Sequence, residues 1–143
     1  MSGVRLKGRR VVRGYAEGVA IVSRNAISFY GGVDPKTGHV MERGHELEGK
    51  SIADLILVFP TGKGSTVGSY TLYQMKKLGT APKAIINKET EIIIATGCAL
   101  AGIPIIDRLE RDPLEEIETG DYVKVDANKG EVDVRKKTSS PSP

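Results

Sequence analysis

The sequence predicts an α/β domain in which a central βαβ element is wrapped by β-hairpins. A continuous apolar run at residues 54–59 has the length of a strand that is buried on both faces. Apolar side chains then recur at mostly helical spacing over residues 65–78, and a second short apolar run follows at residues 83–87. Strand, helix and strand in this order predict the βαβ element, and strand-like stretches at both ends of the chain predict the hairpins.

The N-terminal part of the chain is expected to form β-structure and turns. Residues 11–23 alternate loosely between apolar and polar side chains, and Gly14 and Gly18 mark expected bends. Within residues 27–42, the sequence Asp34 to Gly38 has a proline and a glycine at positions that favour a turn. This region is therefore expected to form a long hairpin or a structured loop.

The central strand and helix have clear end signals. Pro60 ends the strand, because proline cannot donate a backbone hydrogen bond, and Gly79 is expected to close the helix as its C-cap. The helix is predicted over residues 65–78. Its periodic apolar positions are Val67, Tyr70, Leu72, Met75 and Leu78.

The C-terminal part of the chain continues the α/β pattern. Residues 91–101 are ambiguous, since three isoleucines favour a strand and the alanine-rich end tolerates a helix, and a helix beginning near Thr90 is preferred. A strand is predicted at residues 103–107. Residues 122–126 and 131–135 are predicted to form a hairpin.

Length and composition favour one folded domain. Residues 1–135 are assigned to the domain, and residues 136–143, rich in lysine, serine and proline, are predicted to be a disordered tail. The net charge is only +3 and the chain has no tryptophan, so the basic, aromatic surface of a nucleic-acid-binding protein is not expected. No stretch approaches the roughly 20 apolar residues that span a bilayer, and a cytoplasmic protein is expected.

The cysteine and histidine content restricts the cofactors that this chain could hold. Cys98 is the only cysteine, so an internal disulfide is excluded. Together with His39 and His45 it is too small a ligand set for an iron-sulfur cluster or a structural zinc site. Cys98 is predicted to be a small buried side chain, the two histidines to be surface or hairpin residues, and Asp34 to organise its turn.

The segment between the central strand and helix is the candidate functional site, because ligands bind at the carboxyl ends of strands in open α/β sheets. A nucleotide-binding P-loop is excluded, since Leu57 stands where that motif needs glycine and Gly64 where it needs serine or threonine. Ser65 has two open interpretations, an N-cap of the helix or a reactive hydroxyl. A serine base would need helix-terminal amides or the nearby Lys63 to stabilise its alkoxide.

A series of motifs gives the chain a specific resemblance. It resembles the small subunits of the aconitase X family over nearly all of residues 5–135. The motifs are Gly31-Gly32-Val33-Asp34-Pro35, Leu57-Val58-Phe59-Pro60, Gly62-Lys63-Gly64-Ser65-Thr66, Gly68-Ser69-Tyr70, Ala81-Pro82-Lys83-Ala84-Ile85-Ile86, Ala101-Gly102-Ile103-Pro104 and Gly120-Asp121.

The resemblance implies a swivelling β/β/α domain that is encoded apart from its larger partner. It implies a hydro-lyase that is active only with a cysteine-bearing large subunit, which holds a 4Fe-4S cluster as Lewis acid. By motif position, Ser65 is then the proton acceptor. The implied reaction converts 5-phosphomevalonate to anhydromevalonate 5-phosphate in the mevalonate pathway. A cis-3-hydroxyproline dehydratase subunit and a non-catalytic anion-binding module are the alternatives.

One position departs from the aconitase pattern. Aconitases have an arginine for the substrate carboxylate two residues after the serine, whereas this chain has Val67. Substrate anions are therefore expected to contact Lys63, or the backbone amides from Gly64 to Thr66.

Overall fold

The computed structural model describes residues 3–137, which form one mixed sheet with helices packed on it. The strands are β1 (Gly3–Lys7), β2 (Arg9–Val12), β3 (Tyr15–Val22), β4 (Ile56–Phe59), β5 (Ala84–Asn87), β6 (Ile105–Asp107), β7 (Tyr122–Asp126) and β8 (Glu131–Arg135). The helical segments are α1 (Phe29–Gly32), α2 (Gly68–Leu78), α3 (Ile92–Ala101) and α4 (Pro113–Glu116).

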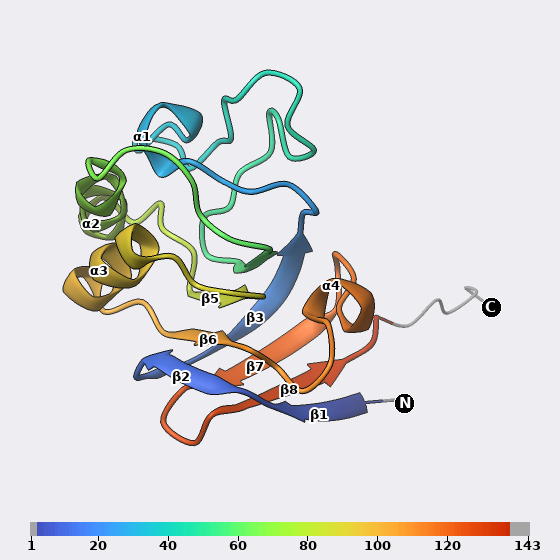
Figure 1. Ribbon diagram of the computed structural model, residues 1–143. Helices are drawn as coiled ribbons and strands as arrows, with labels where there is room; N and C mark the ends of the chain where they lie inside the picture. The colour runs from blue at the N-terminus through green and yellow to red at the C-terminus, as the bar shows by residue number, and fades with distance from the viewer. Residues whose placement is uncertain (1–2, 138–143) are drawn as a thin grey trace.

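The sheet has the strand order β1-β8-β7-β3-β4-β5-β6-β2. Strands β3 to β6 run parallel, whereas β2 is antiparallel to β6, and β3, β7, β8 and β1 pair antiparallel. Only Gly8 separates β1 from β2, although these strands stand at opposite ends of the order (Figure 1). The sheet therefore folds back on itself. A side chain at Gly8 would lie 2.7 Å from the Asp107 carbonyl oxygen, so this crossing requires glycine.

The predicted α/β class and its central βαβ element are confirmed, because β4 and β5 are parallel neighbours with α2 between them. The C-terminal hairpin is confirmed with the predicted bounds. The N-terminal strands, in contrast, do not pair with one another within residues 3–137, since β1 joins β8 and β2 joins β6. Gly14 is a bend with φ +138°, but Gly18 is not, because it stands in register opposite Val123.

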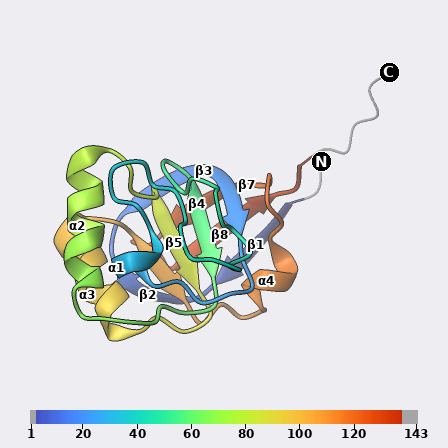
Figure 2. The same cartoon turned by 90° about the horizontal axis from the view of Figure 1, so that it is seen from above.

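The central strands are buried on both faces, as their apolar runs predicted. In β4, Leu57 and Phe59 belong to the core beneath α2 and α3, while Ile56 and Val58 belong to a second core on the other side of the sheet. Figure 2 shows α2 and α3 on one side and α4 on the other. Consecutive residues of a strand point to opposite faces, so one short apolar segment supplies both cores.

Local capping explains where the helices lie. Residues 92–101 are a helix, as preferred, since the Glu91 carboxylate accepts hydrogen bonds from the amides of Ile93 and Ile94. Gly79 closes α2 in the left-handed conformation with φ 78°, which confirms the predicted C-cap. Helix α2 begins at Gly68, three residues later than predicted, and the loop that precedes it is correspondingly longer.

The region that follows β3 is a structured loop. It is held by isolated bridges such as Val33 with Val40 and His39 with Ser51, and it contains the short α1. Asp34 organises its turn as predicted, because its Oδ1 accepts a hydrogen bond from the Lys36 amide.

Residues 138–143 of the predicted tail lie outside the described residues. Lys136 and Lys137, which were also assigned to that tail, contact the buried Asp121: the Lys136 Nζ lies 2.6 Å from its Oδ2, and the Lys137 amide donates to its Oδ1. No helix within residues 3–137 combines the length and apolar character that a bilayer span requires.

Candidate active site

The loop between β4 and α2 is anchored to the segment that follows β3. The Ile27 amide donates to the Thr61 carbonyl at 3.2 Å, and the Lys63 amide donates to the Ile27 carbonyl at 3.0 Å. Ile27 and Gly62 form an isolated parallel bridge. Two loops at the carboxyl edge of the parallel strands therefore lie side by side, and the predicted site is at this edge.

Gly64 gives the loop its close approach to Ser28. It has φ +101°, a conformation that other residues rarely adopt. A Cβ atom at Gly64 would also overlap the Ser28 Oγ and lie 3.2 Å from the Ser28 Cβ. Glycine is therefore required at this position for two independent reasons, backbone conformation and space.

Ser65 is exposed and its hydroxyl oxygen receives a backbone hydrogen bond. The Val67 amide donates to Ser65 Oγ at 3.1 Å, and the Gly68 amide donates to the Ser65 carbonyl at 2.9 Å. Val67 directly precedes α2, but it makes no side-chain cap. The two contacts of Ser65 are those of a cap on the turn that leads into α2, so the capping interpretation of Ser65 is compatible with the structure and the reactive hydroxyl stays a prediction. The N–H group beside the Oγ of this exposed residue favours a negative charge on the oxygen.

The backbone around Ser65 leaves hydrogen-bond donors free. The amides of Gly64, Ser65 and Thr66 find no protein acceptor among residues 3–137. Free amides next to a helix N-terminus are suited to bind an anion, because both the N–H groups and the helix dipole favour negative charge. The predicted anion contacts at Gly64 and Thr66 are therefore chemically available.

Lys63 forms an ion pair with Glu42, a residue that the sequence analysis did not identify. Its Nζ lies 2.9 Å from the Glu42 Oε2, and the two side chains are 48% and 33% exposed. Glu42 precedes Lys63 by 21 residues in a different loop, and no spacing pattern connects them. The cation expected to meet a substrate anion is thus neutralised by a carboxylate in this structure.

The neighbouring hydroxyls are less suited to act as a base. Ser69 is buried and its Oγ donates to the Thr66 carbonyl at 2.9 Å. The Thr66 side chain is exposed, but unlike Ser65 it has no backbone amide directed at its hydroxyl among the described residues. Of these three hydroxyls, that of Ser65 alone combines an exposed residue with a polarising N–H donor.

The cysteine and the histidines lie apart from this chemistry. Cys98 is fully buried against the core beneath α2 and α3, as predicted, and burial raises the pKa of its thiol. His39 is exposed, as expected, but the prediction of a surface position is wrong for His45, which is 7% exposed. The Leu47 amide lies 3.0 Å from its Nδ1, and its Nε2 lies 3.0 Å from the Ala26 carbonyl, so His45 fastens two loop segments.

The chain's own residues do not fit an iron-sulfur cluster. Residues 3–137 contain no group of three or more histidine, cysteine, aspartate or glutamate side chains that could hold a metal ion. A cluster needs several thiolates, and the single cysteine is enclosed in the core.

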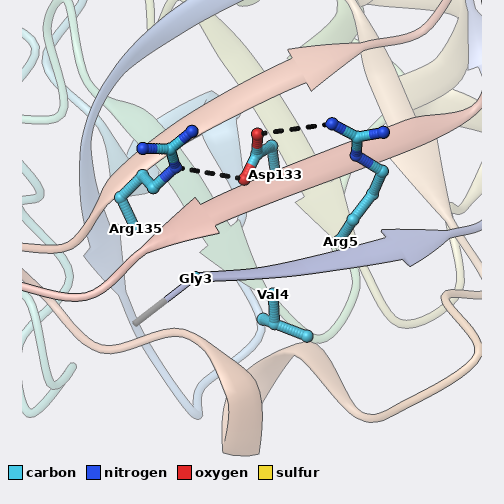
Figure 3. A pocket seen from close by; sticks show the side chains of 5 residues that line it. All are labelled: Gly3, Val4, Arg5, Asp133 and Arg135. Carbon is cyan, nitrogen blue, oxygen red and sulfur yellow. Dashed lines mark ion pairs between the residues drawn. The ribbon is translucent and has the colours of Figure 1, made fainter. Parts of the chain in front are cut away.

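A pocket elsewhere on the molecule differs in character from the Ser65 loop. It lies on β1 and β8 and is lined by Gly3, Val4, Arg5, Asp133 and Arg135 (Figure 3). The Asp133 carboxylate forms ion pairs with both arginines there, with Arg5 at 3.9 Å and with Arg135 at 3.5 Å. The charged side chains of this pocket are paired with one another on the antiparallel strands β1 and β8, so the pocket presents no reactive group.

Exposed apolar side chains lie around the Ser65 loop. We call Tyr30, Met41, Val67 and Tyr70 the apolar rim, and their exposed fractions are 56%, 58%, 41% and 69%. The segments that carry them lie close together: the Met41 amide donates to the Gly32 carbonyl at 2.7 Å, and the Tyr30 nitrogen would lie 3.6 Å from a Cβ atom on Gly68, next to Val67. Large apolar side chains exposed together are typical of protein contact sites.

A sequence model described as aconitase X swivel domain matches residues 5–134. The chain belongs to this family. The resemblance inferred from the motifs is therefore confirmed, and the eight-stranded mixed sheet with its helices is the swivel-domain fold.

Individual relatives match over nearly their whole length. The phosphomevalonate dehydratase small subunit of Methanosarcina acetivorans is 53% identical over 140 residues, which are 98% of this chain and 97% of the relative. The crystal structure of Thermococcus kodakaraensis aconitase X in its holo-form has a TM-score of 0.88 at 51% identity, over 93% of this chain and 99% of that chain. A solution NMR structure of another relative has a TM-score of 0.84 at 51% identity, over 93% of this chain and 100% of that chain.

Proposed function

We propose that this chain is the small subunit of a heteromeric aconitase-type hydro-lyase that dehydrates 5-phosphomevalonate to anhydromevalonate 5-phosphate in the mevalonate pathway. The near full-length likeness to a relative with the name phosphomevalonate dehydratase small subunit supports the reaction. The observation that carries the role of this chain is the exposed Ser65 hydroxyl, whose oxygen accepts the Val67 amide beside three free amides.

In the proposed reaction Ser65 acts as the base. Its alkoxide takes the proton from the carbon next to the one that bears the departing hydroxyl. The electron pair of the broken C–H bond becomes the second bond of the new double bond, and the hydroxyl leaves with the C–O electron pair. The Val67 N–H and the N-terminal end of α2 lower the free energy of the alkoxide, because both place positive partial charge beside it.

The free amides give the substrate anion its binding groups. Val67 stands where aconitases have arginine, and its exposed side chain carries no charge. We assign anion binding instead to the backbone amides of Gly64 and Thr66 and to the Lys63 ammonium. Amides are fixed by the loop, so they hold an anion without the loss of side-chain freedom that a long arginine undergoes.

The second half of the active site is assigned to a partner. A departing hydroxyl needs an acid that accepts its electron pair, and in this proposal a 4Fe-4S cluster on a cysteine-bearing large subunit would serve as that Lewis acid. The apolar rim around Ser65 would be buried in the contact between the two subunits, and the Ser65 hydroxyl would then lie at the subunit interface. A cytoplasmic heterodimer is the form that we propose.

The test is reconstitution with the large subunit. Both chains are co-expressed, the complex is purified without oxygen after cluster assembly, and 5-phosphomevalonate and cis-3-hydroxyproline are assayed with each chain alone as control. We expect dehydration of 5-phosphomevalonate by the complex only. Turnover of cis-3-hydroxyproline in its place would reassign the substrate. A complex without activity on either compound, together with anion binding by the small chain alone, would favour a binding module.

A further inference from the structure

We propose that Glu42 limits the anion affinity of the Ser65 loop by holding Lys63 in an ion pair, which an incoming anion must replace. This inference rests on the proposed function, in which Lys63 and the neighbouring amides meet an anionic group of the substrate. It adds a residue that neither the motif nor the spacing around Ser65 indicates.

The pair is anchored on both sides by the backbone. The Met41 amide, next to Glu42, donates to the Gly32 carbonyl at 2.7 Å. The Lys63 amide donates to the Ile27 carbonyl at 3.0 Å. Both side chains therefore start from fixed points, and the 2.9 Å contact between Nζ and Oε2 follows from the fold of the two loops.

The charges explain why this pair weakens anion binding. The loop offers partial positive charge from free amides and a full positive charge from Lys63, and Glu42 cancels the full charge. An anion that reaches the ammonium must displace the carboxylate and then remain near it, where like charges repel. Because both side chains are partly exposed, the pair itself is weak and an anion can replace it.

A limit on affinity suits a dehydratase whose substrate and product carry the same anionic group. The anionic group does not react. If the enzyme binds this group equally tightly in the ground state and in the transition state, KM falls but kcat does not rise. Tight binding of the group also slows release of the product. Glu42 would therefore keep the common anionic group from being held too tightly beside Ser65.

The charge of Glu42 can be removed with little change of shape. Glu42→Gln keeps the side-chain length and one oxygen that accepts a hydrogen bond from Lys63, so the loop keeps its contact and loses only the negative charge. Glu115→Gln is the matched control, because it removes one carboxylate charge on α4, where Glu115 pairs with Arg24 and is 64% exposed. Lys63→Met removes the cation and keeps most of the side-chain length.

The test is a titration of the full chain with inorganic phosphate at low ionic strength, followed by amide chemical shifts of the loop. The structure of a relative that aligns with 93% of this chain has been determined by solution NMR, so an isolated chain of this kind suits the measurement. We expect Glu42→Gln to tighten the Kd for phosphate about fivefold, and to tighten the Kd for acetate less, because the repulsion scales with the product of the charges. Glu115→Gln should leave both constants unchanged, and the gain from Glu42→Gln should shrink in the Lys63→Met background, where only the direct repulsion between Glu42 and the anion remains to be removed.

Three results would overturn the inference. They are an unchanged or weaker affinity in Glu42→Gln, a gain that is just as large in the Lys63→Met background, and a loop whose amides respond to phosphate in none of the variants. Because the titration involves no turnover and no large subunit, its outcome is separate from that of the reconstitution assay. A complex without dehydratase activity would remove the proposed reaction and leave the ion-pair result standing.

Discussion

The Val67 amide donates a hydrogen bond to the Ser65 Oγ across 3.1 Å. In the proposed function Val67, at the position where the resemblance predicts an aconitase arginine, acts on the hydroxyl through its backbone amide and not through its side chain. In the proposed dehydratase this contact ties the reactivity of the hydroxyl to the conformation of the loop. Changes that shift the loop backbone should therefore lower turnover even where they leave every reacting side chain in place.

Gly64→Ala tests this dependence on the loop backbone. The added Cβ overlaps the Ser28 Oγ and forces a residue with φ +101° to move. We expect turnover of the reconstituted complex to fall about tenfold or more, since small displacements of catalytic groups are costly. Steady-state kinetics of the complex, with circular dichroism of the small subunit, measures the two effects separately.

Gly49→Ala is the matched control. Gly49 has a similar positive φ of 81°, but nothing lies within 4 Å of a Cβ atom placed on it. It should lower stability by about 1 kcal/mol from backbone strain and leave turnover unchanged. Equal losses of turnover in the two variants would show that the Ser28 contact has no special role.

A buried carboxylate near the end of β6 should make stability depend on pH. Burial alone raises the pKa of Asp107, but hydrogen bonds from Arg9 at 2.8 and 2.7 Å and from the Thr90 amide outweigh it, and its pKa is held below the ordinary range. A lowered pKa stabilises the folded protein above the unfolded value of about 3.9, and this contribution is lost as the pH falls through the folded value.

Asp107→Asn should lower the free energy of unfolding by about 2 kcal/mol at pH 7, because the buried carboxylate loses its charge-assisted hydrogen bonds from Arg9. The difference from wild type should shrink as the pH falls below about 4. Urea unfolding across this range measures it, with Asp133→Asn as a control whose more exposed pair should cost less than about 1 kcal/mol. A loss that is the same at every pH would contradict the ionic origin.

Cys98 should have no part in cofactor binding. Its thiol is fully buried, and burial raises its pKa, so native protein should resist alkylation by iodoacetamide until it unfolds. Cys98→Ala should cost about 1 kcal/mol of stability and leave the iron content and turnover of the complex unchanged. Loss of iron from an otherwise assembled complex would place a cluster ligand on this chain.

The parts of the fold that the sequence predicted are those with local signals. Leu57 and Phe59 reach one core and Ile56 and Val58 the other, so an uninterrupted apolar run was enough to identify β4. The β7–β8 hairpin likewise combines alternation with a turn. The pairing of β1 with β8 and of β2 with β6 could not be predicted. The partners are distant in sequence, and the residues of an edge strand do not indicate which strand it will pair with.

The candidate site was predictable to a similar degree. Ser65 and its glycine-rich surroundings follow from their place between a buried strand and a helix. The contact from Glu42 to Lys63 and the buried role of His45 depend on how a long irregular loop folds over the sheet edge. Such contacts arise from tertiary packing, and they cannot be predicted from the spacing of residues in the sequence.

The most direct test of the account is the turnover of Ser65→Ala in the reconstituted two-subunit complex. Ser69→Ala is the control, because Ser69 lies in the first turn of α2 and its buried hydroxyl donates to the Thr66 carbonyl. We predict that Ser65→Ala assembles normally and turns over 5-phosphomevalonate at least about 100-fold more slowly, whereas Ser69→Ala stays within about threefold of wild type. A Ser65→Ala complex that keeps wild-type turnover would contradict the assignment of Ser65 as the base.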